Sequence, residues 1–158
     1  MIKKFLITLF FFFGIFNVEM ALSQSQCTIG VTAVSFGNYE TFSSIPTDAT
    51  GTITVNCGYR VVKANVKLGV SSTSGTFNPR RMKRSGGSDL LDYNIYTDTA
   101  RTVILGDGTG GTSDIELKRP TGPPADWSET ITTYGRIPPG QDVSVGTYSD
   151  TLTATVTP

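Results

Sequence analysis

Histidine is absent from the 158-residue chain, and cysteine is scarce, with only two residues. Without histidine the chain has no Ser-His-Asp or Cys-His arrangement, so the common nucleophilic mechanisms are excluded. A zinc site is a poor fit as well, because two thiolates without imidazole leave the usual tetrahedral ligand set incomplete. We therefore predict that the protein is not an enzyme and that it uses no cofactor and no metal.

No apolar run reaches the roughly 20 residues that a membrane-spanning helix needs. The longest apolar stretch, residues 5–18, follows two lysines and precedes small residues at 21–23. A short basic region, an apolar stretch and small residues at a cleavage position are typical of a secretory signal peptide. We predict a signal peptide over residues 1–23, cut after Ser23, and one exported domain over residues 24–158. The alternative is an uncleaved anchor, which the shortness of the apolar stretch disfavours, so no stable membrane anchor is expected.

Charged residues are also few, with 13 basic and 13 acidic side chains. Removing residues 1–23 takes away two lysines and one glutamate and leaves 11 basic and 12 acidic residues, a net charge of −1. A chain so close to neutral lacks the charge for general binding to nucleic acid or to an anionic membrane. Nucleic acid is therefore not expected among its partners.

Both cysteines lie in the exported part, and export implies an oxidising compartment. A single bond between Cys27 and Cys57 is the simplest interpretation of two such residues. On the chain-entropy model, closing a loop of this length stabilises the fold by ~3.6 kcal/mol.

The exported part is rich in threonine, serine and glycine, with valine and isoleucine alternating among them. Apolar residues at every second position are typical of half-buried strands, and no window has helical periodicity. Strands are predicted over residues 27–36, 51–57, 62–70, 77–84, 91–95, 115–117, 127–137 and 146–158. We count seven or eight strands at the spacing of an all-β sandwich. The first is expected to contain a bulge or to change sheets, because its apolar phase slips at Val34 and Phe36.

The last predicted strand has the most regular alternation of all. Its inner row consists of Tyr148, Leu152, Ala154 and Val156. Asp150 alone interrupts that row. A sandwich strand this regular needs a neighbour on each side, and no later segment of the sequence is there to pair with it. We expect either that an earlier strand flanks it or that a partner supplies the missing strand.

One basic cluster lies in the hairpin predicted from residues 77–95. It consists of Arg80, Arg81, Lys83 and Arg84. These side chains could contact a partner's carboxylates, a phosphate or an acidic glycan; the alternative, which we favour, is a solvated hairpin whose charges prevent edge aggregation. Trp127 poses a similar choice, because it could stack on a sugar or close the core as a lid.

Several sequence blocks follow one another in a fixed order along the exported chain. They are Cys27-Thr28, Phe36-Gly37-Asn38-Tyr39, residues 49–57 (ATGTITVNC), Arg80-Arg81-Met82, residues 91–98 (LDYNIYTD), residues 106–110 (GDGTG), residues 134–138 (YGRIP) and residues 146–150 (GTYSD). In this content and order the chain resembles the spore coat protein U domain. The blocks cover nearly all of the exported part, which makes the resemblance specific.

The resemblance implies an incomplete immunoglobulin-like β-sandwich that needs a donor strand, as in subunits of archaic chaperone-usher pili of the Csu type. Such a protein is a non-enzymatic structural subunit of a surface fibre, exported through the periplasm to the cell surface. Its implied partners are a periplasmic chaperone, an outer-membrane usher and other pilus subunits that exchange strands with it. Strand addition of this kind uses main-chain hydrogen bonds for affinity and side-chain pockets for register. The donor strand would pack beside the inner row that ends at Val156.

The chain departs from the pattern of polymerising pilins at its start. Cleavage after Ser23 leaves three polar residues, 24–26, ahead of Cys27, whereas a donor segment of about a strand's length has ~5 to 6 residues or more. We therefore expect a subunit that accepts a strand without giving one, as a terminal or accessory subunit does. Two alternatives remain open: a spore or cell coat component, and a self-contained carbohydrate-binding sandwich that uses Trp127 and the basic cluster.

Overall fold

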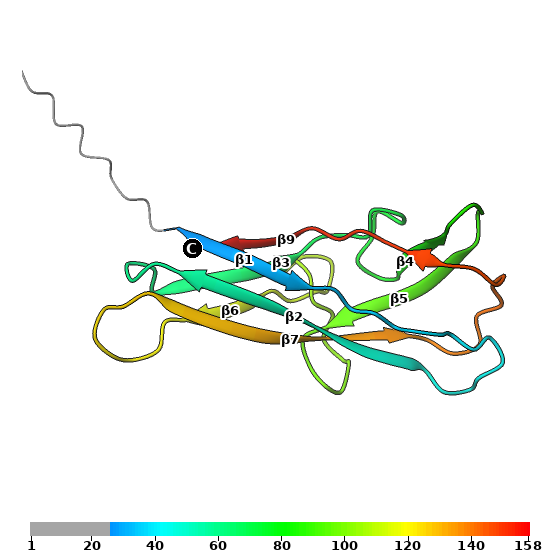
Figure 1. Ribbon diagram of the computed structural model, residues 1–158, viewed down its shortest axis with the longest axis horizontal. Coiled ribbons are helices and arrows are strands. Elements are labelled where there is room, and N and C mark those ends of the chain that lie inside the picture. The colour runs from blue at the N-terminus through cyan, green and yellow to red at the C-terminus, as the bar shows by residue number, and fades with distance from the viewer. Residues whose placement is uncertain (1–25) are drawn as a thin grey trace, which may run out of the picture.

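The computed structural model describes residues 26–158, so the predicted signal peptide lies outside the described part. The strands are β1 (Cys27–Thr32), β2 (Thr47–Cys57), β3 (Lys63–Leu68), β4 (Arg80–Arg84), β5 (Leu90–Tyr96), β6 (Ile115–Lys118), β7 (Trp127–Ile137), β8 (Tyr148–Ser149) and β9 (Ala154–Thr157). They form a six-stranded sheet in the order β1-β2-β7-β5-β4-β8 and a three-stranded sheet in the order β6-β3-β9 (Figure 1). Within this range there is no helix, and so none that could cross a membrane. The predicted all-β, immunoglobulin-like sandwich is confirmed.

Strands β2 and β7 form the spine of the larger sheet. Each has 11 residues, and they pair antiparallel along their whole length, from Thr47 opposite Ile137 to Cys57 opposite Trp127. The inward side chains of β2 are buried, while outward threonines meet across the strands, with 2.9 Å between the hydroxyls of Thr54 and Thr130. Strand β7 has the predicted bounds, but β2 begins four residues earlier than predicted. Its first residues lack apolar alternation, and pairing with β7 holds them extended.

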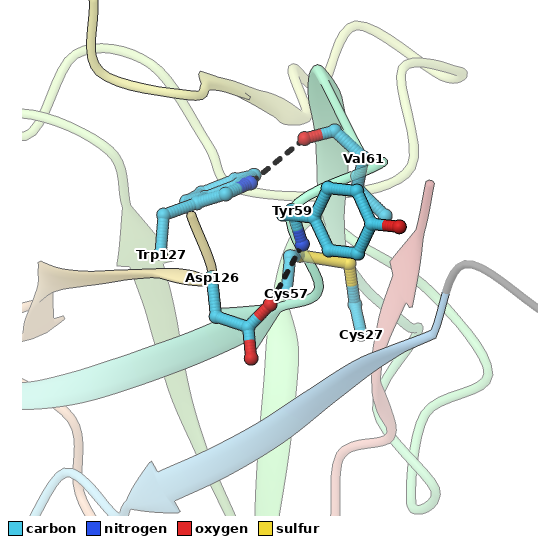
Figure 2. The surroundings of a disulfide bond; sticks show 6 residues. All are labelled: Cys27, Cys57, Tyr59, Val61, Asp126 and Trp127. Carbon is cyan, nitrogen blue, oxygen red and sulfur yellow. Dashed lines mark hydrogen bonds between the residues drawn. A yellow bond between two sulfur atoms is a disulfide. The ribbon is translucent and has the colours of Figure 1, made fainter. Parts of the chain in front are cut away.

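The predicted disulfide is confirmed. Cys27 in β1 lies directly opposite Cys57 in β2, and a bond joins the two sulfurs, with 4.1 Å between the Cα atoms. Trp127 lies beside this bond with 7 % of its surface exposed, and its indole Nε1 donates to the carbonyl of Val61 at 2.8 Å (Figure 2). Trp127 is therefore a lid on the core, and the carbohydrate-binding alternative is wrong in giving it a sugar to stack on.

The shift in apolar alternation at Val34 and Phe36, within the first predicted strand, follows the end of β1. Strand β1 stops at Thr32, and residues 33–40 continue without regular pairing. Val34 and Phe36 then pack over Gly135 in β7, where a Cβ atom would come within 2.7 Å of either side chain. A glycine is therefore needed at this point, because any larger residue would push this segment off the sheet. The expected bulge or change of sheet within this strand is not what the structure shows.

The last predicted strand is in fact two strands in different sheets. Strand β8 pairs with β4 in the six-stranded sheet, and β9 pairs with β3 in the three-stranded sheet. The chain changes sheets at Asp150, whose carboxylate accepts hydrogen bonds from the hydroxyls of Ser72 and Tyr93, each at 2.8 Å. The prediction of one continuous strand is wrong because these bonds hold the chain where it crosses from one sheet to the other.

Candidate functional site

A groove runs along one side of the sandwich, between residues 31–41 on one wall and residues 143–154 on the other. It has two adjoining compartments, of about 480 Å³ toward β9 and about 700 Å³ toward the loops at the other end. The buried apolar and aromatic residues that line its floor come from five strands: Ile53, Leu68, Met82, Leu91, Tyr93, Ile95 and Ile137. Figure 1 shows β1 in blue and β9 in red side by side along this side of the molecule. The groove thus reaches the buried core between two walls that are far apart in the sequence.

Both walls of the groove are strand edges. Strand β1 pairs only with β2, β8 only with β4 and β9 only with β3, so all three are edge strands within residues 26–158. Between β8 and β9, the carbonyls of Thr151 and Thr153 accept from the amides of Ser72 and Gly69, neither of which lines the groove. The backbone edges that face the groove have no strand partner in the described part of the chain. Free edges on both sides of an apolar floor suit an extended peptide segment.

The structure brings together three of the four residues predicted for the donor-strand groove. Tyr148, Leu152 and Ala154 line it, and each is partly buried against the core. Val156 also packs against the core but does not line the groove. The opposite wall was missed, although the slip in apolar phase at Val34 and Phe36 was the signal that could have found it.

Among residues 26–158, Asp150 is the one charged side chain that lines the compartment nearer β9. Burial raises the pKa of its carboxyl, but hydrogen bonds from Ser71, Tyr93 and Ser72 outweigh this, and the pKa lies below its ordinary value. Burial, and next the bond to Asp150, raise the pKa of the Tyr93 hydroxyl. Asp150 is therefore ionised and Tyr93 neutral at physiological pH. The carboxylate of Asp150 thus already accepts hydrogen bonds from donors within the chain.

The basic cluster is not the exposed patch that its sequence suggests. Arg80 is wholly buried, and its guanidinium donates to Asn94 Oδ1 and to the carbonyls of Gly69 and Leu105, each at 2.8 Å. Burial lowers the pKa of this guanidinium, but an arginine so placed keeps its charge. For Arg80 both interpretations of the basic cluster are wrong, the solvated position that we favoured and the possible partner contact, because its donors are spent on acceptors in the core.

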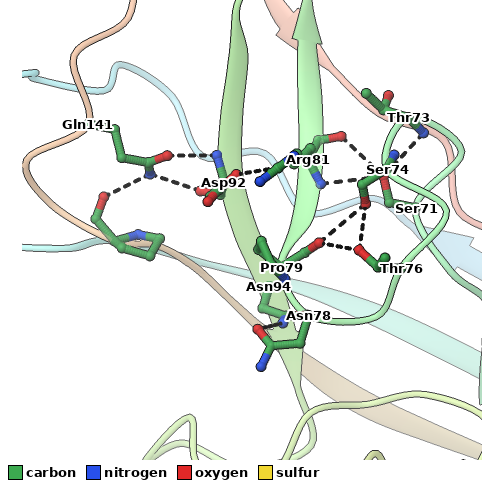
Figure 3. A network of polar contacts seen from close by, with 11 residues as sticks. Ser71, Thr73, Ser74, Thr76, Asn78, Pro79, Arg81, Asp92, Asn94 and Gln141 are labelled. Atoms are coloured by element: carbon green, nitrogen blue, oxygen red, sulfur yellow. Dashed lines mark hydrogen bonds and ion pairs between the residues drawn. The ribbon is translucent and has the colours of Figure 1, made fainter. Parts of the chain in front are cut away.

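The other members of the cluster face solvent to different degrees. Arg81 pairs with Asp92 at 2.9 Å, and Arg84 pairs with Asp89 at 2.9 Å. Asp92 also takes part in the network of Figure 3, where its backbone N–H donates to Gln141 Oε1 at 2.7 Å. Lys83 makes no ion pair among residues 26–158. Most of the basic side chains of this hairpin therefore bind groups within the chain itself.

Several other acidic residues serve turns and ion pairs. Asp98, for example, accepts from the backbone N–H of Val103 at 2.8 Å, and this bond and those from Thr102 hold the pKa of its carboxyl below the ordinary value. Asp107 accepts in the same way from Thr109. Within residues 26–158 no group of three histidines, cysteines or acids is placed to hold a metal.

The fold and the groove together define an immunoglobulin-like sandwich domain with one open side. The chain belongs to the Spore Coat Protein U domain family, whose model matches residues 13–155. Protein U of Myxococcus xanthus is 30 % identical to it over 146 residues, which cover 83 % of this chain and 76 % of that protein.

Among solved structures, the chain is similar to one in the CsuC–CsuE chaperone–tip adhesion subunit pre-assembly complex, from archaic chaperone-usher Csu pili of Acinetobacter baumannii. The TM-score is 0.58 and the identity is 22 %. The match covers 84 % of this chain but only 39 % of the other. At this level of identity the likeness supports the fold.

Proposed function

We propose that the groove accepts an extended strand from another protein, and that the chain is a non-enzymatic structural subunit of a fibre on the cell surface. The observation that carries the proposal is a groove that reaches the apolar core between strand edges that have no partner in the described part of the chain. Apolar surface and free edges of this kind promote aggregation in an isolated protein. A strand in the groove would cover both.

The likeness to the chaperone-bound pilus subunit supports the following order of donors in this proposal. A periplasmic chaperone lends the first strand, an outer-membrane usher receives the complex, and a strand from another subunit replaces the chaperone in the fibre. Each donor lies between the β1 edge and the β8–β9 edge, so chaperone and subunit compete for the same groove.

A second candidate function is a component of a spore or cell coat. The observation in its favour is the family's own description, which is that of a spore coat domain. Mechanical shearing separates the two candidates, because a fibre subunit is released with the filaments whereas a coat component stays with the cell or spore. Genes for a chaperone and an usher beside this one would favour the fibre.

The decisive experiment compares three chains exported to an oxidising compartment without a chaperone. They are residues 24–158 alone, the same chain with a turn and an alternating Val-Thr segment appended after Pro158, and a matched chain whose appended segment is Ser-Thr only. We expect the first and third to aggregate, swap strands or be degraded, and the second to be a monomer with a cooperative unfolding transition. If residues 24–158 alone are a stable monomer that unfolds cooperatively, the fold closes itself and the proposal is wrong.

A further inference from the structure

Strand β6 forms one edge of the three-stranded sheet, and β9, which borders the groove, forms the other. Strand β6 pairs with β3 alone among the strands of residues 26–158. Just past the end of β6, the backbone N–H of Arg119 donates to the carbonyl of Val62 at 3.0 Å. Because backbone groups alternate in direction along an antiparallel strand, Leu117 also turns its groups toward β3. The amides and carbonyls of Glu116 and Lys118 therefore point away from the sheet.

This edge of β6 borders open space. A cavity of about 520 Å³ lies between the start of β6 and β7, and Glu116, Ile131 and Tyr134 are among its lining residues. Strand β7 pairs with β5 only through residues 134–136, so residues 127–133 have no second strand partner in the described part of the chain. In Figure 1, β6 and β7 lie on the side of the molecule away from β1 and β9. The backbone of β6 is thus within reach of a strand from another chain.

The exposed side chains of β6 carry opposite charges two residues apart. The carboxylate of Glu116 lies 3.1 Å from the ammonium of Lys118 and 3.1 Å from that of Lys63, all on the outer face of the sheet. A lysine alone on an edge strand deters pairing with another chain. Here an acid stands beside the lysine, and ion pairs this exposed contribute little to stability. Both charges are therefore free to take new partners at little cost.

We infer that β6 is a contact surface for a second copy of this chain, in which two β6 strands pair antiparallel about a two-fold axis at Leu117. In this register the backbone of Glu116 exchanges hydrogen bonds with that of Lys118 of the partner subunit, and symmetry repeats the pair on the other side of the axis. Each acid then lies opposite a lysine, which stabilises the pairing. The contact is separate from the groove, and Pro120, which has no N–H, ends it.

Charge disfavours the neighbouring registers. A two-fold axis at Glu116 would place that acid opposite its own copy, and an axis at Lys118 would do the same with the lysine. Moving the axis one residue further in either direction would pair Glu116 with Asp114, or Lys118 with Pro120, which cannot donate. Parallel pairing in register would also bring like charges together. The sequence of β6 therefore fits one arrangement of two copies.

The test measures dimer formation by sedimentation of the chain with the Val-Thr segment appended after Pro158. We expect a reversible dimer. Glu116→Lys and Lys118→Glu should each raise its dissociation constant at least about 10-fold, because two unlike pairs become like pairs. The double variant with both reversals restores the unlike pairs, so its dissociation constant should return to within about threefold of the wild type. Lys67→Glu, on the same face of the central strand β3, is the matched control and should change nothing.

A second measurement does not depend on the appended segment. In cells that export the unmodified chain, Glu116→Cys together with Lys118→Cys should give a reducible dimer, because hydrogen-bonded partners in an antiparallel pair lie about 5.5 Å apart at Cα, within disulfide range. Lys63→Cys with Asn65→Cys, on β3, should give none. A folded chain that stays monomeric, or a double reversal that fails to restore the dimer, overturns the inference. If the appended segment does not give a folded chain, the proposed function fails, and the cysteine variants alone decide the β6 contact.

Discussion

The two sides of the sandwich differ in how completely their strands are paired. On one side β2 and β7 run together for 11 residues, and a disulfide fixes β1 to β2. On the other, β8 and β9 have two and four residues, lie in different sheets and leave one edge open. Both sides have the same threonine-rich alternation in sequence. Alternation therefore reports which face of a strand is buried, and only the tertiary pairing shows whether its edges are closed.

The largest effect should come from replacing Arg80, the buried cation. Replacing Arg80 by methionine leaves the carbonyls of Gly69 and Leu105 and the amide of Asn94 without their donors in the core. We expect the free energy of unfolding to fall by about 3 to 5 kcal/mol. Urea unfolding of the strand-complemented chain measures this. In the control, Lys83→Met at the exposed end of β4 should change stability by no more than about 0.5 kcal/mol; equal losses in both would contradict the assigned role of Arg80.

The second largest effect should come from removing the disulfide on the paired side. Changing Cys27 and Cys57 together to alanine should lower the free energy of unfolding by ~3.6 kcal/mol, because the unfolded chain regains the entropy of its loop. Denaturant unfolding of the oxidised and the double-alanine chains gives the difference. Mass spectrometry of the non-reduced wild-type chain should find no free thiol, and two free thiols would refute the bond.

A change on the open wall should affect binding more than folding. Leu152→Thr removes an apolar side chain beside which any incoming strand packs, and we expect strand affinity to fall by about 1 to 3 kcal/mol. Competition between a labelled Val-Thr peptide and the chaperone complex measures it. Thr155→Ser, on the outward face of β9, is the matched control and should leave affinity unchanged. A similar loss in both variants would show that Leu152 is not part of the binding wall.

Low pH should lower the stability of both sides of the sandwich, because folding lowers the pKa of a carboxyl on each side. Hydrogen bonding to Arg136 lowers the pKa of Asp48 on the paired side, and the pKa of Asp150 is lowered on the open side. Each ionised form contributes stability that is present above the ordinary pKa of about 3.9 and is lost as the pH falls through the folded-state value. Melting temperatures between pH 7 and pH 2 should therefore fall less steeply below about pH 4 in Asp150→Asn and in Asp48→Asn than in the wild type. Identical slopes would mean that neither carboxyl carries the acid sensitivity.

The smallest effect should come from the exposed part of the basic cluster. Replacing Arg81 and Lys83 together by glutamine removes one surface ion pair and one unpaired charge, and we expect a change in stability within about 0.5 kcal/mol. Retention on heparin at physiological salt should be weak for the wild type and for the double variant, because the exported chain is close to neutral. Strong retention by the wild type that the double variant loses would show a polyanion site.

The parts of the fold that sequence predicted are those fixed by local alternation. Strand β7 is an example. The bond between Cys27 and Cys57 was predicted on another ground, because two cysteines in an exported chain allow a single pairing. The burial of Arg80 was missed because its acceptors come from Gly69, Asn94 and Leu105, which are distant in sequence. The break at Asp150 was missed for a similar reason: its donors come from β5 and from the loop after β3. Charge patterns in sequence do not record such long-range partners.

The disulfide also determines how the domain responds to a pulling force. Cys27 lies at the very start of β1, and its sulfur is bonded to the last residue of β2, the strand that pairs with β7 along its whole length. Tension applied to the chain ahead of Cys27 therefore passes through the covalent bond into the spine and does not peel β1 away. The 30-residue separation between the cysteines corresponds to roughly 100 Å of extended chain, none of which can be drawn out while the bond is intact. The wall of the groove that β1 provides is therefore protected from a force applied ahead of Cys27.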